Sequence, residues 1–308
     1  MTEGWFRRVV TQAASQDWVE DFIRQSPLSR RMVERFVAGE TRDEALKAAV
    51  ALAAKGMTAT LDHLGEEVTN VGAAQAATHS AAETLRALAR LRLQPNVSVK
   101  LTTLGLNLDE RLAFDSLSGL LAVAAKVDGF VRVDMEGSAY TGRTLDIVET
   151  LHADYPSRVG TVIQAALLRS ERDVERLIEK RIRVRLVKGA YAEPSSIALQ
   201  DRDEIELAFA RLMERLLEDG IYPAIATHDD TLIRATRSFS LRMGLSPQQW
   251  EFQMLYGVRR AAQQALADAG YRMRIYVPFG TDWYPYFSRR IAERPSNALF
   301  VVRQLGSR

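Results

Sequence analysis

The segment YFSRRIAERPSN, residues 286–297, carries its reactive side chains at a helical spacing. An aromatic ring, two guanidinium groups and a carboxylate stand at positions i, i+3, i+4 and i+7: Tyr286, Arg289, Arg290 and Glu293. This spacing places them on one face of a helix. Adjacent guanidinium groups suit a carboxylate or a phosphate, because each binds such an anion through two N–H donors. The segment therefore predicts either an anion-binding face or a solvated face of self-paired charges.

A second group of polar residues stands where short β-branched runs end. It comprises Asp62, Lys100, Asp134, Glu136, Gln164, Lys188, Thr227, His228, Gln253 and Tyr276. Side chains alternate between the two faces of a strand, so Arg132, Asp134 and Glu136 are expected on one face. Because an unpaired buried charge is costly, we expect these groups to form ion pairs or to bind a ligand.

Several chemical roles are open for these residues. Lys100 and Lys188 suit a cofactor contact, a Schiff-base lysine or a salt bridge to Asp134 or Glu136. His228 suits either a ligand contact or a hydrogen-bonded core position. The chain has four histidines without HxH or HxxxH spacing and no cysteine, so we expect no metal site.

The elements that must position these residues alternate between strand and helix patterns. Strand patterns are predicted at 57–65, 96–105, 129–137, 160–167, 183–190, 222–229, 250–257 and 272–280. This alternation is typical of parallel βαβ units, and eight units predict an α/β fold, a closed (β/α)8 TIM-like barrel. Active sites of such barrels lie at the C-terminal ends of the strands, where the polar residues cluster.

Helical patterns at 17–25, 29–39 and 41–56 precede the first strand, and the last begins after Thr41, an N-cap residue, and ends at Gly56. We therefore expect a helical segment, residues 1–55, packed on a barrel, residues 56–308. The sequence GWFRRVV, residues 4–10, suits a membrane-interface patch or, by preference, packing against the barrel.

The composition of the 308 residues is that of a globular protein, with 47% hydrophobic and 26% charged residues. A net charge of +2 makes nucleic acid an unexpected partner. No apolar stretch approaches about 18 residues, and neither a signal peptide nor cysteine is present, which favours a cytoplasmic protein. GxGxxG and GxxxxGK[ST] are absent, so a nucleotide cofactor would have to lie on the barrel rim.

Seven segments occur in order from about residue 57 to the C-terminus: LDHLGE, SVKLTTLG, VRVDMEGS, VRLVKGAY, ATHD, EFQMLYG and YVPFGTDWYPYFSRRIAERPSN. Together they resemble the flavin-dependent proline dehydrogenase family. The resemblance implies a distorted (β/α)8 barrel that binds FAD at the strand C-termini. It also implies oxidation of L-proline to Δ1-pyrroline-5-carboxylate, with electrons passed to a membrane quinone.

The resemblance also assigns roles to individual residues. Arg289 and Arg290 would clamp the proline carboxylate, and Glu66 would pair with this clamp and gate the site. The other substrate positions are Lys100, Asp134, Leu255, Tyr276 and Tyr286. Positions that match flavin contacts are Gln164, Arg185, Val187, Lys188, Gly189, Ala190, Thr227, His228 and Glu293.

The chain departs from many relatives at Ala192, where they carry an aromatic residue, and at Asp229, where they carry asparagine. It ends at Arg308 without an aldehyde dehydrogenase module or a DNA-binding segment, which suggests the monofunctional bacterial form. That form implies coupling to a pyrroline-5-carboxylate dehydrogenase and peripheral contact with the inner face of the membrane. Two alternatives are a Schiff-base lyase that uses Lys100 or Lys188, and a non-catalytic binding or sensor protein.

Overall fold

The structure is a computed structural model that describes residues 33–65 and 68–292, with the side chains of 289–292 excepted. The helix predicted at 17–25, and the residues Glu66 and Glu293, lie outside the described residues. The division of the chain at residue 55 therefore stays a prediction.

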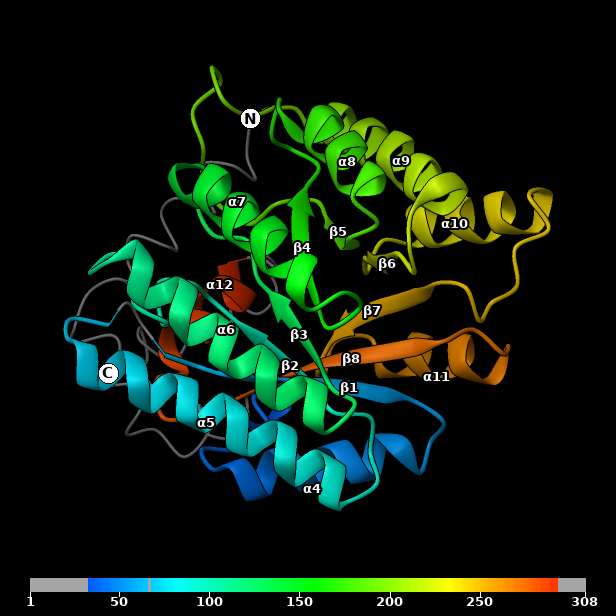
Figure 1. The fold of residues 1–308 in the computed structure, drawn as a ribbon. Coiled ribbons are helices and arrows are strands. Elements are labelled where there is room, and N and C mark those ends of the chain that lie inside the picture. Colours follow the sequence, from blue (N-terminus) through cyan, green and yellow to red (C-terminus); the bar gives the residue numbers. More distant parts are fainter. Residues whose placement is uncertain (1–32, 66–67, 293–308) are drawn as a thin grey trace, which may run out of the picture.

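Eight parallel strands form a closed barrel in chain order, which confirms the predicted fold (Figure 1). Every predicted strand is present. The strands are β1 (Thr58–His63), β2 (Asn96–Val99), β3 (Phe130–Val133), β4 (Val159–Gln164), β5 (Arg183–Val187), β6 (Ala224–Ala226), β7 (Glu251–Leu255) and β8 (Met273–Phe279).

Helices follow the strands and surround the barrel (Figure 1). They are α4 (Arg42–Ala53), α5 (Val71–Arg90), α6 (Glu110–Lys126), α7 (Ser138–Asp154), α8 (Ser170–Glu179), α9 (Arg202–Asp219), α10 (Asp230–Arg242), α11 (Arg260–Asp268) and α12 (Tyr284–Ala292). The predicted cap of α4 is confirmed, because Thr41 accepts a hydrogen bond from the backbone N–H of Glu44. One hydrophobic core joins the inner sides of the helices to the strands, and residues such as Leu117 and Val133 are fully buried in it.

All eight strands are shorter than the sequence pattern predicts, and the differences are largest for the predictions 96–105, 129–137 and 222–229. The predictions 96–105 and 129–137 are wrong beyond Val99 and Val133, where the strands end. After Val99 the chain forms local turns, in which Leu104 N–H donates to the carbonyl oxygen of Lys100 at 3.3 Å. Lys100 and Asp134 therefore lie just past their strands, at the rim of the barrel.

A second, smaller hydrophobic cluster joins α12 to the first described residues of the chain. It consists of Val33, Phe36, Val37, Leu64, Trp283, Tyr284, Tyr286 and Phe287. Gly257, in the loop after β7, lies directly against this early segment. Its φ of +74° is in the left-handed region, and a Cβ added there would overlap the carbonyl oxygen of Arg35. The absence of a side chain at Gly257 thus allows residues 33–37 to pack beside the barrel.

This close contact predicts a difference between two glycine substitutions. Gly56 has the same φ of +74° but nothing within 4 Å of an added Cβ, so Gly56→Ala carries only the backbone strain. We expect Gly56→Ala to lower the free energy of unfolding by about 1 kcal/mol. Gly257→Ala should cost at least about 2 kcal/mol, because the backbone of residue 35 must also move. Urea unfolding measures both, and equal losses would contradict the assigned contact.

Candidate active site

Asp134 and Arg185 form the central ion pair of the rim. Arg185 Nη1 donates to Asp134 Oδ1 at 2.7 Å, and Ser98 Oγ donates to the same oxygen at 2.9 Å. Both charged residues are buried, so each depends on the other for the compensation of its charge. The guanidinium also lies 5.3 Å from the ring centre of Tyr276, a cation–π distance.

Tyr276 connects this ion pair to a second carboxylate. Its hydroxyl lies 2.6 Å from Asp62 Oδ2 and 2.8 Å from Asp134 Oδ2. Burial and the carboxylates of Asp134 and Asp62 raise the pKa of Tyr276 well above its usual value, so the hydroxyl retains its proton.

Lys100 lies beside Asp62, with 3.3 Å between its ammonium nitrogen and Oδ2. Burial favours the neutral amine, but the carboxylates of Asp62, Asp134 and Glu136 outweigh burial and raise the pKa of Lys100. The prediction that Lys100 forms a salt bridge is therefore confirmed. The predicted partners Asp134 and Glu136 are wrong, because the ammonium group is hydrogen-bonded to Asp62. Glu136 accepts instead from Thr102 Oγ1 at 2.6 Å.

Further buried groups support Arg185 from inside the barrel. Gln253 Oε1 accepts from Arg185 Nε at 2.6 Å, and Gln253 Nε2 donates to Glu251 at 2.6 Å. Glu251 in turn pairs with Arg274 at 2.9 Å. The chain of contacts therefore crosses the barrel from β3 through β5 and β7 to β8.

The ends of β4 and β5 are joined by Gln164. Its Nε2 donates to the carbonyl oxygen of Glu136 at 2.9 Å, and its Oε1 accepts from Ala190 N–H at 3.4 Å. Val187, the last residue of β5, accepts from Ala165 N–H at 2.8 Å. Gly189 has a φ of +125°, and an added Cβ would lie 3.3 Å from that of Ala166. The backbone after β5 is thus held close to the loop after β4.

Lys188 points to a different set of carboxylates from the one that the salt-bridge alternative named. Its ammonium group lies 2.7 Å from Glu206 in α9 and 3.1 Å from Asp229, the N-cap of α10. The expected partners Asp134 and Glu136 are wrong for this residue. Asp229, noted as a departure from many relatives, is therefore both a helix cap and one half of this ion pair.

Thr227 and His228 follow β6, beside the end of β7. His228 Nε2 accepts from Leu255 N–H at 3.0 Å, so the neutral ring carries its proton on Nδ1. Thr227 Oγ1 accepts from Asp229 N–H at 3.1 Å. The structure thus brings Thr227, His228 and Leu255 together at the rim, as the sequence predicts.

The segment that carries the two adjacent arginines is helical where it is described. Tyr286, Arg289 and Arg290 belong to α12, and Tyr286 is buried in the second cluster, against which Tyr276 also packs. The side chains of Arg289 and Arg290, like Glu66 and Glu293, lie outside the described residues. Their predicted contacts stay predictions.

The candidate site includes residues that the sequence patterns did not assign. Ser98, Glu206 and Glu251 complete the chains of contacts. Alternation along a strand with Lys100 and Gln253 could have indicated Ser98 and Glu251, whereas Glu206 lies in α9 and no such signal marks it. Glu193, in the loop 188–201 after β5, accepts from Ser138 N–H at 2.7 Å and from Ser138 Oγ at 2.6 Å. It supplies a carboxylate to the N-terminus of α7, where the N-cap Gly137 offers no side chain.

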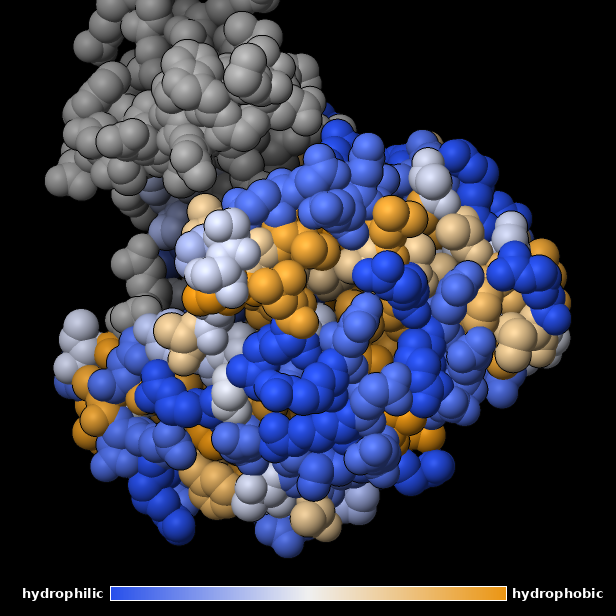
Figure 2. Space-filling model, turned by 90° about the horizontal axis from the view of Figure 1, so that it is seen from above, coloured by the Kyte–Doolittle hydropathy of each residue, from blue (hydrophilic) through white to orange (hydrophobic). Residues whose placement is uncertain are grey.

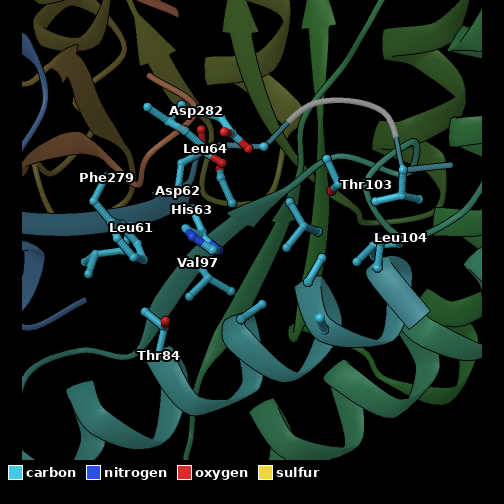
Figure 3. A pocket seen from close by; sticks show the side chains of 18 of the residues that line it. Leu61, Asp62, His63, Leu64, Thr84, Val97, Thr103, Leu104, Phe279 and Asp282 are labelled. Atoms are coloured by element: carbon cyan, nitrogen blue, oxygen red, sulfur yellow. The ribbon is translucent and has the colours of Figure 1, made fainter. Parts of the chain in front are cut away.

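A cavity of about 410 Å³ lies between α5 and the strands β1 and β2 (Figure 3). Leu61, Val97 and Leu104 form apolar walls, and Asp62 and Asp282 line it as well. The cavity therefore reaches the acidic residue that pairs with Lys100.

The described residues hold no group of three or more histidine, cysteine, aspartate or glutamate side chains that could bind a metal ion. Within the same ranges, no helix combines the length and the apolar composition that a membrane span requires. On the face seen in Figure 2, hydrophobic residues form separate patches between hydrophilic ones.

The Glu193 contact predicts local stability of the loop that carries Lys188, Gly189 and Ala190. Glu193→Gln keeps the size of the side chain but removes the charge and one acceptor. Because a hydrogen bond to a charged group contributes about 1.5 kcal/mol or more, amide exchange in 188–201 and the first turn of α7 should accelerate about tenfold. Hydrogen-exchange mass spectrometry measures this, with the exposed Glu204→Gln as control. Equal exchange in both variants would contradict it.

Comparison with known proteins agrees with this geometry. The family model described as proline dehydrogenase matches residues 45–303. The chain is 38% identical to the proline dehydrogenase of Deinococcus radiodurans, with 98% of each chain covered. It is 41% identical to proline dehydrogenase 1 of Bacillus subtilis subsp. natto, over 89% of this chain and 91% of that protein.

Among solved structures, proline utilization A (PutA) from Bdellovibrio bacteriovorus superposes with a TM-score of 0.80 and 28% identity. The match covers 86% of this chain and 33% of that longer protein. The fold, the rim residues and these matches lead to one conclusion: the chain belongs to the proline dehydrogenase family of oxidoreductases.

Proposed function

We propose that the protein binds FAD and oxidises L-proline to Δ1-pyrroline-5-carboxylate. The observation that carries this proposal is the buried cluster of Asp134, Arg185, Tyr276 and Lys100 at the rim, next to the α12 helix that carries Arg289 and Arg290. Such a cluster supplies fixed charges and hydrogen-bond donors beside an anion-binding helix, which is what the oxidation of a zwitterionic amino acid needs.

The residues at the ends of β4, β5 and β6 fit a flavin. Gly189 leaves its backbone open at a position where a side chain would crowd Ala166, and Gly189 and Ala190 are exposed. Gln164 fixes this backbone, and Thr227 and His228 extend the same arc of the rim. Lys188 is already paired with two carboxylates. We therefore propose that the flavin is bound mainly by the backbone of Gly189 and Ala190 and by the side chains of Gln164 and His228. When bound, FAD supplies the hydride acceptor at N5.

For the substrate, we propose that Arg289 and Arg290 bind the carboxylate through paired N–H donors. Tyr286, Tyr276 and Leu255 would pack around the ring. Asp134 would orient the arginines, while Lys100 and Asp62 set the charge beside the amine. We further propose Glu66 as a gate and Glu293, Arg185 and Val187 as flavin contacts.

We propose a membrane quinone as the electron acceptor, with the protein in the cytoplasm and in peripheral contact with the membrane. The product is a cyclic imine in equilibrium with an aldehyde, so a pyrroline-5-carboxylate dehydrogenase would consume it. The names of the matched relatives support the activity, and the resemblance of the rim segments supports the acceptor.

The Schiff-base lyase alternative is disfavoured by the lysines themselves. A nucleophilic lysine must be neutral, but the raised pKa of Lys100 keeps it protonated. The nitrogen of Lys188 is engaged by two carboxylates, at 2.7 Å from Glu206 and 3.1 Å from Asp229, which leaves it poorly placed to attack a carbonyl carbon.

The proposed activity predicts a colour change. Purified protein should be yellow. L-Proline added in the absence of oxygen should bleach the flavin absorbance within minutes. Tetrahydro-2-furoic acid has the carboxylate but no amine, so it should shift the spectrum without bleaching it. Colourless protein that does not take up FAD, or flavin that proline leaves oxidised, would contradict the proposal.

The arginine clamp predicts a loss of affinity in two variants. Arg289→Met and Arg290→Met should each weaken tetrahydro-2-furoic acid binding by about 10- to 150-fold, the equivalent of about 1.5–3 kcal/mol. Arg→Lys should be nearly as harmful, since an ammonium group cannot reproduce two-point binding. Arg211→Met, on the exposed surface of α9, is the matched control. Unchanged analogue affinity at normal flavin content would exclude the clamp.

A further inference from the structure

The hydroxyl of Tyr276 lies between two carboxylates. Two hydrogen bonds at these contacts need two protons, and the hydroxyl supplies only one. Its oxygen is 2.6 Å from Asp62 Oδ2 and 2.8 Å from Asp134 Oδ2, both within the range of short O–H···O bonds. A hydroxyl has a single proton and can donate only one of these bonds. The second contact becomes a hydrogen bond only when one of the carboxyl groups carries a proton of its own.

The neighbours of the two aspartates decide which one accepts that proton. The Asp134 carboxylate already accepts two short hydrogen bonds, from a guanidinium donor at 2.7 Å and from a hydroxyl donor at 2.9 Å. Among the described residues, the donors to Asp62 are Tyr276 and the Lys100 ammonium, and the latter lies at the longer distances of 3.3 and 3.4 Å. The proton is therefore better accommodated on Asp62, from which it is donated to Tyr276 while Tyr276 donates to Asp134.

We propose that Asp62 is the base that takes the proton from the substrate amine, and that Tyr276 stabilises the product of this step by reversing its hydrogen bond. The inference rests on the proposed function. One N–H bond of the prolinium group breaks, its electron pair stays on nitrogen, and an O–H bond forms on Asp62. Tyr276 then accepts from Asp62 and donates to Asp134. The neutral amine has the lone pair that formation of the C=N bond requires.

The other titratable groups nearby are less suited to this role. Lys100 stays protonated because its pKa is raised, and Tyr276 retains its proton for the same reason. Arg185 is paired with Asp134, and Glu136 is held by Thr102. His63, the neighbour of Asp62 in β1, contacts Ser80 and stacks on Phe279 instead. Tyr191 is 44% exposed and therefore lies outside the buried cluster. The side chains of Arg289 and Arg290 lie outside the described residues.

The cavity beside β1 gives the accepted proton a route away from the site. Asp62 is itself only 2% exposed, but it lines the cavity of about 410 Å³ together with Thr103 and Asp282 (Figure 3). A water molecule needs about 30 Å³, so several can enter. Because Asp62 contributes to the lining of this cavity, we expect the accepted proton to exchange with solvent there.

Asp62→Asn keeps the shape of the side chain but cannot accept a proton. We expect rapid-mixing measurements to show flavin reduction by proline at least about 100-fold slower than in the wild type. The rate should also rise about tenfold per pH unit across the neutral range, because only proline already neutral in solution would react. Flavin content and tetrahydro-2-furoic acid affinity should stay within about threefold, and Asp146→Asn, an exposed surface change, is the control.

Two further measurements separate a base from a residue that only positions Lys100 and Tyr276. Asp62→Ala should regain activity with added formate, whereas a positioning role predicts no rescue and weaker analogue binding. Infrared difference spectra between acidic and alkaline pH should show a protonated carboxyl band that Asp62→Asn lacks and Asp146→Asn retains. This band is measured without proline, so it tests Asp62 even if proline does not bleach the wild-type flavin. Absence of the band, or an unchanged rate and pH profile in Asp62→Asn, would overturn the inference.

Discussion

The buried charges inside the barrel constrain the rest of the structure. Asp134, Arg185, Glu251 and Arg274 come from four strands or their ends and are linked through Gln253. Removing one partner of such a chain leaves an uncompensated charge at a cost of about 3–5 kcal/mol. A shift of one residue in strand register would separate these partners and turn them toward the helices. Closure of the barrel and assembly of the site are therefore the same physical requirement.

The same constraint gives the site its rigidity. The carboxylate of Asp134 is held by Arg185 and Ser98, and the ring of Tyr276 lies under the guanidinium. Groups fixed in this way need little reorganisation when charge develops on a ligand, which is the main source of electrostatic catalysis. The parts expected to hold the flavin and the substrate are the loop after β5 and α12, which follow the strands and lie outside this chain of buried charges. The hydrogen bonds between Glu193 and Ser138 restrict the motion of the loop after β5.

Tyr276 links the two functions of the rim. Its ring lies beside Arg185 and packs against the cluster that contains Tyr286, where a small ring substrate is proposed to pack, while its hydroxyl connects Asp62 to Asp134. Tyr276 would then both orient the substrate through its ring and stabilise the protonated form of Asp62 through its hydroxyl. Lys100 complements this arrangement because its positive charge offsets the two carboxylates without competing for the proton.

The sequence by itself determined the elements and the identity of most rim residues, because periodicity, caps and strand-end polarity are local signals. Eight strands were predicted and eight are present, although each ends earlier than predicted, as at Val99, after which local turns replace the ladder. Only the tertiary structure decided the partners. Lys100 binds Asp62, 38 residues away, and Tyr276 bonds Asp62 across 214 residues. Such pairings depend on which strands close the barrel and in what register, and neither residue type nor spacing along the chain contains that information.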